Sequence, residues 1–531
     1  MECVKLEKPC GEDTIAKVVR GTGGFAAQRF INSVLGALIF VYAALMLTKT
    51  EMGVYGSANM VYSIATLLAS LGLPTAASRF TAYLLAKQRI AEVRVTARNI
   101  ALITLAVAST LSSLLILFSQ DISQSMLGTY EYAQTFQILS ITAFATVLSS
   151  VSAGFLLGLQ KFRQLASIYL TAQTVRFALT VFLLTAGFGV SSLFWGLSAY
   201  NLLIVASAVP IAFAVLHTNK DGKGQATFSF RSLLAFTIPM AIYGAISYIF
   251  NSVDSFMVLG LLGVEELGLY TAAVTVTSFT LTVLGASFSD TLTSCMSHTC
   301  GAFGHEALAL ETKRMSRYAS FIFIPAATGL AALSPLIVKI LGEQKYMHAA
   351  PLITISSIGL ILYFIPILII SALVAVGKTA KAMQIMTLTL LAGIGPCAIL
   401  TAKFGVTGTA ISKALLFTIL LGISIEVGRK AIPLDFDKRA ILASMASSAV
   451  MGLAVYSMAA QTGFTLILLP FYILAGVAIF TATLASTKTV KMEDIQLLLK
   501  TIPKGKAIRQ KISKTTNNSK LITKIVRKLL S

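Results

Sequence analysis

Apolar segments long enough to cross a lipid bilayer recur along almost the whole chain. A hydrocarbon core of about 30 Å requires about 20 apolar residues per helix. Hydrophobic residues make up 56% of the 531 residues and charged residues only 12%, too few for a water-facing fold. The alternating strands of a membrane β-barrel are nowhere dominant. The sequence predicts an all-α polytopic membrane protein with about 14 transmembrane helices, at 25–48, 57–85, 100–118, 135–158, 164–187, 190–216, 232–262, 271–296, 317–341, 351–376, 381–401, 405–427, 439–459 and 463–486.

Lysine and arginine are distributed unequally between the two sides of this arrangement. Short loops rich in these residues stay in the cytoplasm. The side that carries both termini holds eighteen of them: Lys87, Arg89, Arg94, Arg98, Lys161, Arg163, Lys220, Lys223, Arg231, Lys313, Arg314, Arg317, Lys378, Lys381, Arg429, Lys430, Lys438 and Arg439. The other side holds four: Lys49, Lys339, Lys345 and Lys403. We therefore expect a multi-pass cell-membrane protein with both termini in the cytoplasm. The formal net charge of +21 is largely explained by this topology and does not call for a nucleic-acid partner.

A pattern from the first half of the chain returns in the second half at a nearly constant spacing. EMGVYGSA from Glu51 is echoed by ELGLYTAA from Glu266 at an offset of 215 residues. EYAQTFQILSI from Glu131 is echoed by KYMHAAPLITI at an offset of 214, and Phe188-Gly189-Val190 returns as Phe404-Gly405-Val406 at an offset of 216. Three echoes at nearly one spacing indicate an internal duplication, in which the segment 236–273 opens the second copy. Each copy has an even number of spans, so the two six-helix lobes are parallel repeats, and such repeats usually hold a substrate between them.

The duplication divides the chain into six predicted segments. They are a cytoplasmic N-terminal segment (1–24), a first lobe (25–216), a cytoplasmic linker (217–231), a second lobe (232–427), two further helices (428–486) and a basic cytoplasmic tail (487–531). The tail holds twelve Lys or Arg, and residues 521–530 follow the spacing of an amphipathic basic helix suited to an anionic membrane surface. A solvated tail is the alternative interpretation.

The six-plus-six-plus-two layout, the Glu-x-Gly-x-Tyr step at Glu51 and Glu266, and the steps GLQKF and FGV resemble one transporter family. They are similar to the polysaccharide-unit flippases of the multidrug/oligosaccharidyl-lipid/polysaccharide exporter superfamily, over about residues 15–500. The resemblance implies a two-lobed transporter that moves a polyprenyl-(di)phosphate-linked oligosaccharide to the outer leaflet by alternating access, for cell-surface polysaccharide synthesis. It also implies that the protein acts beside glycosyltransferases.

Charges inside membrane spans are costly, and they are therefore candidates for function. The cations predicted to bind substrate are Arg29, Arg79, Arg176 and Lys413. A guanidinium group matches phosphate oxygens in a bidentate fork, whereas lysine acts as a point charge. Arg29 and Arg79 lie close enough to helix ends to extend to the membrane interface instead. Arg176 lies near the middle of its predicted span, so a phosphate-binding role is favoured there.

Asn251 and Asp254 are the predicted polar or coupling residues of the second lobe. They lie one helical turn apart, and the pair could bind a coupling cation or a proton or form hydrogen bonds to a sugar. The structural alternative is that Asp254 forms a buried ion pair with Arg176 or Lys413. A second acid, Asp290, is expected to be a solvated helix end.

Several other functions are disfavoured by the sequence. Cys295, His298, Cys300 and His305 lie close together but have no standard zinc spacing, so we expect no metal, and no cofactor is implied. The chain has no phosphate loop for ATP, and its loops leave no room for a soluble catalytic domain, so an enzyme such as a membrane glycosyltransferase or ligase is the less favoured alternative. A cation-coupled multidrug exporter of the same superfamily is the nearer rival. Such exporters typically use acids in the core of the first lobe, where helix one of this chain offers Arg29.

Overall fold

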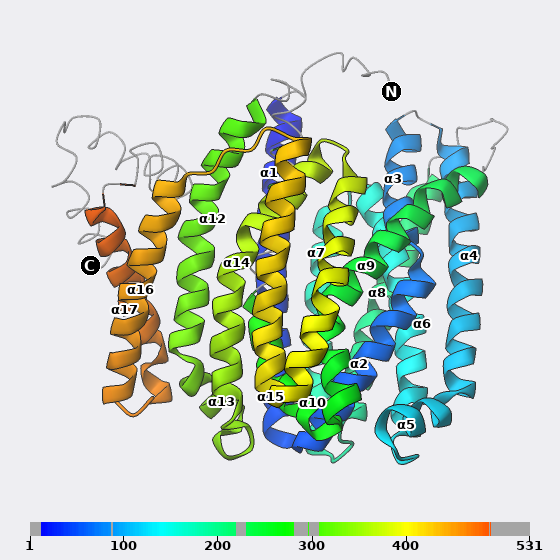
Figure 1. The fold of residues 1–531 in the computed structure, drawn as a ribbon. Helices are drawn as coiled ribbons and strands as arrows, with labels where there is room; N and C mark the ends of the chain where they lie inside the picture. Colours follow the sequence, from blue (N-terminus) through cyan, green and yellow to red (C-terminus); the bar gives the residue numbers. More distant parts are fainter. Residues whose placement is uncertain are drawn as a thin grey trace. The chain divides into compact units, whose positions relative to one another are not determined.

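The computed structural model describes residues 12–86, 89–218, 230–280, 292, 296, 307–487 and 489, and these contain no β-strand (Figure 1). The chain forms two compact units. Unit 1 comprises Met1–Thr275, Gln344–Tyr346 and Ile394–Thr409, and unit 2 comprises Val276–Glu343, Met347–Gly393 and Ala410–Ser531. The helices are α1 (Glu12–Met46), α2 (Lys49–Ser70), α3 (Leu73–Ala86), α4 (Ile90–Leu117), α5 (Ser119–Leu127), α6 (Ala133–Gly158), α7 (Phe162–Thr185), α8 (Ser191–Thr218), α9 (Phe230–Leu262), α10 (Val264–Thr280), α12 (Ala307–Ala332), α13 (Ser334–Tyr346), α14 (Ala349–Ala375), α15 (Thr379–Ala431), α16 (Lys438–Gln461) and α17 (Leu469–Ser486), with a 3₁₀ turn at Leu466–Leu468.

The predicted class, an all-α polytopic membrane protein, is confirmed. Eleven helices of the described residues are long and apolar enough to cross a membrane, and a twelfth span results if α12 and α13, which meet at a 45° bend, are one span. Helix α15 has 53 residues, about 80 Å at 1.5 Å per residue, but it breaks at Gly405 (φ 59°, ψ −146°). It therefore contains the two predicted spans 381–401 and 405–427. The predicted span 271–296 runs beyond α10 into residues that lie largely outside the described ranges.

The helix bounds differ from the predicted spans at several ends. The second predicted span, 57–85, is two helices, because Leu71 and Gly72 adopt positive φ values of 42° and 71° between α2 and α3. Helix α1 begins at Glu12 instead of residue 25, and α4 begins at Ile90 instead of residue 100. Both helices extend past their apolar segments, since a helical backbone satisfies its own hydrogen bonds and can continue into the interface.

The internal duplication is visible in the backbone. Gly189, which precedes α8, has φ 56°, and its repeat partner Gly405 has φ 59°. Residues with a Cβ rarely adopt such values, which explains why the FGV step keeps its glycine in both copies. The turn after α6 is closed by a hydrogen bond of 2.9 Å from Lys161 N to Leu156 O, and the turn after α14 by one of 2.8 Å from Lys378 N to Leu373 O. The two copies therefore share their turns as well as their sequence.

The repeated Glu-x-Gly-x-Tyr step packs against its own copy within unit 1. A Cβ atom built on Gly53 of α2 would lie 1.9 Å from the carbonyl oxygen of Val264, and one on Gly268 of α10 would lie 1.9 Å from that of Lys49. Only glycine allows the two helix backbones to approach so closely. Glu51 begins α2 in a capping box, in which Thr48 N donates to Glu51 Oε2 at 2.8 Å and Glu51 N donates to Thr48 Oγ1 at 3.2 Å. The motif thus starts a helix and permits a close crossing.

Helix α6 is the central helix of unit 1 and packs against α2, α3, α4 and α8 (Figure 1). Two thirds of its membrane window is buried, which is the largest share among the described spans. Two apolar clusters cover its faces, one with Leu165 and Ile204 and another with Leu73 and Ile100. This packing fixes the neighbours α2, α7 and α8, which carry the polar residues described below.

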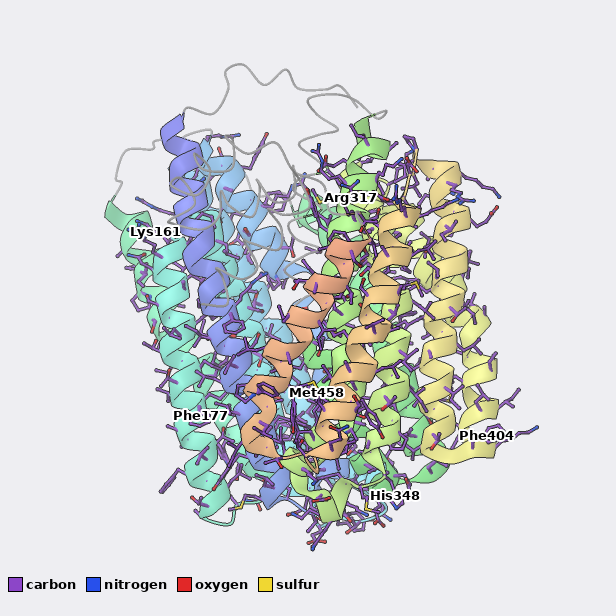
Figure 2. All side chains as sticks on the ribbon, turned by 90° about the vertical axis from the view of Figure 1, so that its left-hand side faces the viewer. Lys161, Phe177, Arg317, His348, Phe404 and Met458 are labelled. Carbon is purple, nitrogen blue, oxygen red and sulfur yellow. The ribbon has the colours of Figure 1, made fainter. Side chains whose placement is uncertain are left out.

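Ion pairs in unit 2 connect α12 to the loop before α16. Arg317, in the upper region of Figure 2, is buried, and its Nε donates to Oδ2 of Asp437 at 2.9 Å. Oδ1 of Asp437 accepts a 3.1 Å hydrogen bond from Ala440 N and so caps α16. Nearby, Lys313 and Asp435 form a second pair at 2.7 Å, with both side chains about half exposed. The loop is therefore fixed to α12 by one buried and one solvated ion pair.

We expect Asp437→Asn to destabilise the protein by about 3–5 kcal/mol, because the amide keeps a cap acceptor but leaves the buried Arg317 without its counter-charge. The matched control is Asp435→Asn on the same loop, which should destabilise the protein far less because water screens the pair of Asp435 with Lys313. Thermal unfolding of the purified protein in detergent measures both. Equal shifts of the melting temperature in the two variants would show that the pair of Arg317 with Asp437 stabilises the protein no more than the solvated pair does.

Some sequence-based expectations concern residues outside the described ranges. They are Asp290, the cysteine and histidine group at Cys295, His298, Cys300 and His305, most of the linker 217–231 and the basic tail beyond residue 489. The described residues contain no group of three or more His, Cys, Asp or Glu that could hold a metal ion. The division into lobes stays a prediction.

Candidate functional site

Arg176 is the deepest of the cations that the sequence singled out. It lies in α7 about 21 Å along the helix from Phe162, at 1.5 Å per residue. In Figure 2 its neighbour Phe177 lies well along α7 from Lys161, which precedes the helix. The Nε atom of Arg176 is buried and has no hydrogen-bond partner among the described residues. Such a buried, unsatisfied donor costs about 1–3 kcal/mol, and more when charged, so a site that retains one is suited to an incoming acceptor.

Tyrosines of two other helices lie near this guanidinium. Arg176 interacts electrostatically with Tyr55 and Tyr62 of α2 and with Tyr200 of α8. A fourth ring, Tyr169, lies two turns before Arg176 on α7 and stacks on Tyr200 with ring centroids 6.4 Å apart and planes at 12°. The helices can approach closely here, because a Cβ on Gly196 of α8 would meet Thr180 Oγ1 of α7 at 1.9 Å.

Arg29 belongs to the same region. It lies on α1, which packs against α7, and it interacts electrostatically with Tyr169. Its side chain is exposed at the surface of the protein. On either side of it, Gln28 Oε1 and Asn32 Oδ1 are buried without hydrogen-bond partners among the residues that the structure describes. We call the set Arg29, Arg176, Tyr55, Tyr62, Tyr169 and Tyr200 the arginine–tyrosine cluster.

A chain of hydrogen bonds between α2, α6 and α8 holds one wall of the cluster. Tyr62 Oη and Thr146 Oγ1 are 3.0 Å apart, and Asn201 Nδ2 donates to Thr146 Oγ1 at 2.7 Å. Ser149 Oγ donates in turn to Asn201 Oδ1 at 2.6 Å. Because each polar group in this chain is satisfied, it fixes the tyrosine in place. Sequence reasoning missed these residues, although Thr142, Thr146 and Ser149 recur on α6 at helical spacing.

The remaining predicted site residues lie elsewhere. Arg79 is an exposed residue of α3. Lys413 is half-buried in unit 2, with its Nζ 5.7 Å from the centroid of the Phe417 ring. Their role in substrate binding stays a prediction.

Asp254 is buried in α9, 1% exposed, and its Oδ2 accepts a 2.6 Å hydrogen bond from the hydroxyl of Tyr270. Tyr270 is the tyrosine of the second Glu-x-Gly-x-Tyr copy. The hydrogen bond of Asp254 thus comes from Tyr270, and the alternative of an ion pair with Arg176 finds no support. Asn251, one turn earlier, is exposed and donates to Ser247 O of its own helix at 2.7 Å. The two residues therefore do not share one environment.

The arrangement in unit 1 is suited to binding an anion. Arg29 interacts with Tyr169 and Arg176 with Tyr200, the two stacked rings lower the local dielectric, and Arg176 forms no salt bridge with any described carboxylate. Three of the described acids of unit 1 have partners elsewhere: Glu51 caps α2, Glu92 pairs with Arg89, and Asp254 accepts a hydrogen bond from Tyr270. This leaves an electropositive, partly aromatic site.

Comparison with known proteins agrees with this picture. Residues 43–351, more than half of the chain, match the family described as polysaccharide biosynthesis protein. The chain belongs to this family. This polysaccharide biosynthesis protein is a multi-pass membrane protein, and the family match agrees with its sequence resemblance to polysaccharide-unit flippases. No curated protein matches its sequence.

Solved structures share the fold of this polysaccharide biosynthesis protein. The lipid II flippase MurJ, in an inward closed conformation, has a TM-score of 0.65 at 18% identity, covering 86% of this chain and 97% of that chain. An inward-facing multidrug resistance transporter of the MATE family has 0.61 at 16%, covering 76% and 97%. A superfamily member from Pyrococcus furiosus, for which a reverse polarity of the binding pocket suggests a different function, has 0.60 at 16%, covering 77% and 95%. At these identities the likeness shows the fold alone.

Proposed function

We propose that the protein flips a polyprenyl-(di)phosphate-linked oligosaccharide from the cytoplasmic to the outer leaflet by alternating access. The observation that carries this proposal is Arg176, a cation near the middle of its membrane span whose buried Nε has no hydrogen-bond partner among the described residues and which interacts electrostatically with Tyr55 and Tyr200. A lipid phosphate would supply the missing acceptor, and the tyrosine rings of the cluster, with the neighbouring amide groups of Gln28 and Asn32, suit the first sugar. Membership of the polysaccharide biosynthesis protein family supports a lipid-linked sugar as cargo.

The rival function, a cation-coupled multidrug exporter, is favoured by the MATE-like fold. It requires an acid that can bind a proton or cation near the cargo. The arginine–tyrosine cluster consists of cations and hydroxyl groups, and a cationic drug would be repelled by Arg29 and Arg176. The balance of charge therefore favours the anionic lipid-linked substrate.

The function is tested with the purified full-length protein in vesicles that contain a fluorescent lipid-linked oligosaccharide. We expect protein-dependent transfer of the lipid between leaflets, and no transport of a cationic dye driven by a sodium or proton gradient. Transport of the dye without movement of the lipid would establish the exporter instead.

The expected orientation, with both termini in the cytoplasm, rests on the charge of the loops. A cysteine placed at Thr129, between α5 and α6, should react in intact cells with a membrane-impermeant reagent, whereas one at Gly377, after α14, should react only after the membrane is opened. Reaction of both cysteines in intact cells would overturn this topology.

Asp254 is proposed to contribute to coupling or to the polar cavity. Asp254→Asn should lower the transport rate while the melting temperature stays near that of the wild type, because the amide oxygen can still accept the hydrogen bond from Tyr270. Tyr270→Phe should instead destabilise the protein by about 1–3 kcal/mol, because it removes the donor to a buried carboxylate. If Asp254→Asn transports normally, Asp254 has only a structural role.

A further inference from the structure

Unit 1 has a groove between α4, α6 and α8, away from the arginine–tyrosine cluster, that the proposed function does not use. The groove encloses about 480 Å³, within the range typical of small-molecule sites. Its floor includes the buried residues Thr104, Val151 and Ala208, and Phe155 and Phe213 line its sides. Arg94 and Arg98, at i and i+4 on α4, line one end.

The walls of the groove below the arginines present no unused polar group. Thr104 Oγ1 donates to Ile100 O at 2.7 Å and Ser152 Oγ donates to Leu148 O at 2.8 Å, so both hydroxyls are satisfied within their own helices. The other lining residues besides the arginines are apolar. A ligand in this region is therefore stabilised by its hydrocarbon groups, and its hydrogen-bonding groups would find no partner among the described residues here.

The charged end is net positive. No acidic side chain is among the described residues that line the groove, and the nearest acid along α4, Glu92, pairs with Arg89. From Arg94 to Thr104 the groove follows α4 for about 15 Å, at 1.5 Å per residue. This is half of a hydrocarbon core of about 30 Å, the depth of one leaflet. An occupant therefore has an anionic head at Arg94 and Arg98 and an apolar chain that spans a single leaflet.

We propose that this groove binds an anionic phospholipid of the surrounding bilayer, with its phosphate at Arg94 and Arg98 and an acyl chain between α4, α6 and α8. A bilayer phospholipid fits better than the transported lipid, because a polyprenyl chain exceeds the length of one leaflet and the groove ends near Thr104. The loop charges put the arginine end on the cytoplasmic side, where anionic lipids are enriched. The proposal does not depend on the transported substrate.

The test uses native mass spectrometry of the full-length protein in detergent with added phosphatidylglycerol or phosphatidylcholine of identical acyl chains. We expect the wild type to retain phosphatidylglycerol preferentially, and R94Q/R98Q to bind it about 30-fold more weakly, as two interfacial arginines imply. The matched control R163Q removes an exposed cation at the start of α7, outside the groove, and should bind like the wild type. Ala101 is an exposed lining residue, so A101W should obstruct the groove and weaken binding without loss of charge.

Three outcomes would overturn the proposal. They are equal retention of the two phospholipids by the wild type, equal loss of phosphatidylglycerol from R94Q/R98Q and R163Q, and displacement of phosphatidylglycerol by an equimolar amount of undecaprenyl phosphate. The last would show that the groove serves a polyprenyl chain. Melting temperatures of all variants, measured without added lipid, show whether each is folded.

Discussion

We expect Arg176→Ala to slow flipping of a lipid-linked oligosaccharide by about 100-fold or more. The substitution removes the cation that is proposed to pair with the lipid phosphate, and truncating one partner of a buried charged pair costs about 2–5 kcal/mol. The guanidinium interacts electrostatically with Tyr55, Tyr62 and Tyr200, and its Nε has no hydrogen-bond partner among the described residues. Arg176→Lys should restore some of the rate, since the charge remains while the bidentate fork is lost. Transfer of a fluorescent lipid between the leaflets of reconstituted vesicles measures all three proteins.

The control for this series is Arg163→Ala. It removes the same side chain from the same helix, at an exposed position near the start of α7. It should leave the flipping rate within about twofold of the wild type, as expected for a surface substitution. Full flipping by a variant in which Arg29, Arg176 and Lys413 are all neutralised would disprove phosphate binding by these cations. A fall in rate accompanied by a fall in melting temperature would point to a structural role for Arg176.

The helical membrane fold could be predicted because hydropathy and loop charge act locally. Each predicted span has a helix at its position wherever the structure describes it, and the FGV repeat marks the same backbone turn at Gly189 and Gly405. The ends were less predictable. Helix α1 begins at Glu12, since polar residues can continue a helix into the interface. At the break between α2 and α3, Gly72 is a residue that favours positive φ, whereas Leu71 is not, so the signal for it in the sequence was weak.

The candidate site could be predicted only incompletely. Charges within apolar segments identify Arg29 and Arg176, because an ionisable group in a membrane span is conspicuous in a sequence. The tyrosines and the bonds of Thr146 to Tyr62 and Asn201 were not foreseen, since they join helices 55 to 84 residues apart in the chain. Tyrosine is also common in membrane helices for other reasons, so its presence carries little signal. The hydrogen bond from Tyr270 to Asp254 was likewise not foreseen.

The second large effect is expected at the crossing of the two repeated motifs. Gly53→Ala and Gly268→Ala should each destabilise the protein by about 3 kcal/mol, the upper end for overpacking. Their new Cβ atoms would lie 1.9 Å from the backbone oxygens of Val264 and Lys49, respectively. These are backbone atoms, so no side-chain rotation can relieve the collision and the helices must move apart. Separation of α2 from α10 would also loosen the position of Tyr270 and Tyr55, which lie two residues beyond the crossing glycines.

The matched control is Gly260→Ala in α9. It makes the same substitution in a helix of the same unit, but no atom lies within 4 Å of the new Cβ. Alanine is favoured over glycine in a helix by about 1 kcal/mol, so this variant should be as stable as the wild type or slightly more stable. Thermal unfolding of the three purified variants separates the two effects. If all three variants, Gly53→Ala, Gly268→Ala and Gly260→Ala, have equal melting temperatures, the helices separate without cost. The glycine of the Glu-x-Gly-x-Tyr motif would then need another explanation, such as a change of helix crossing during transport.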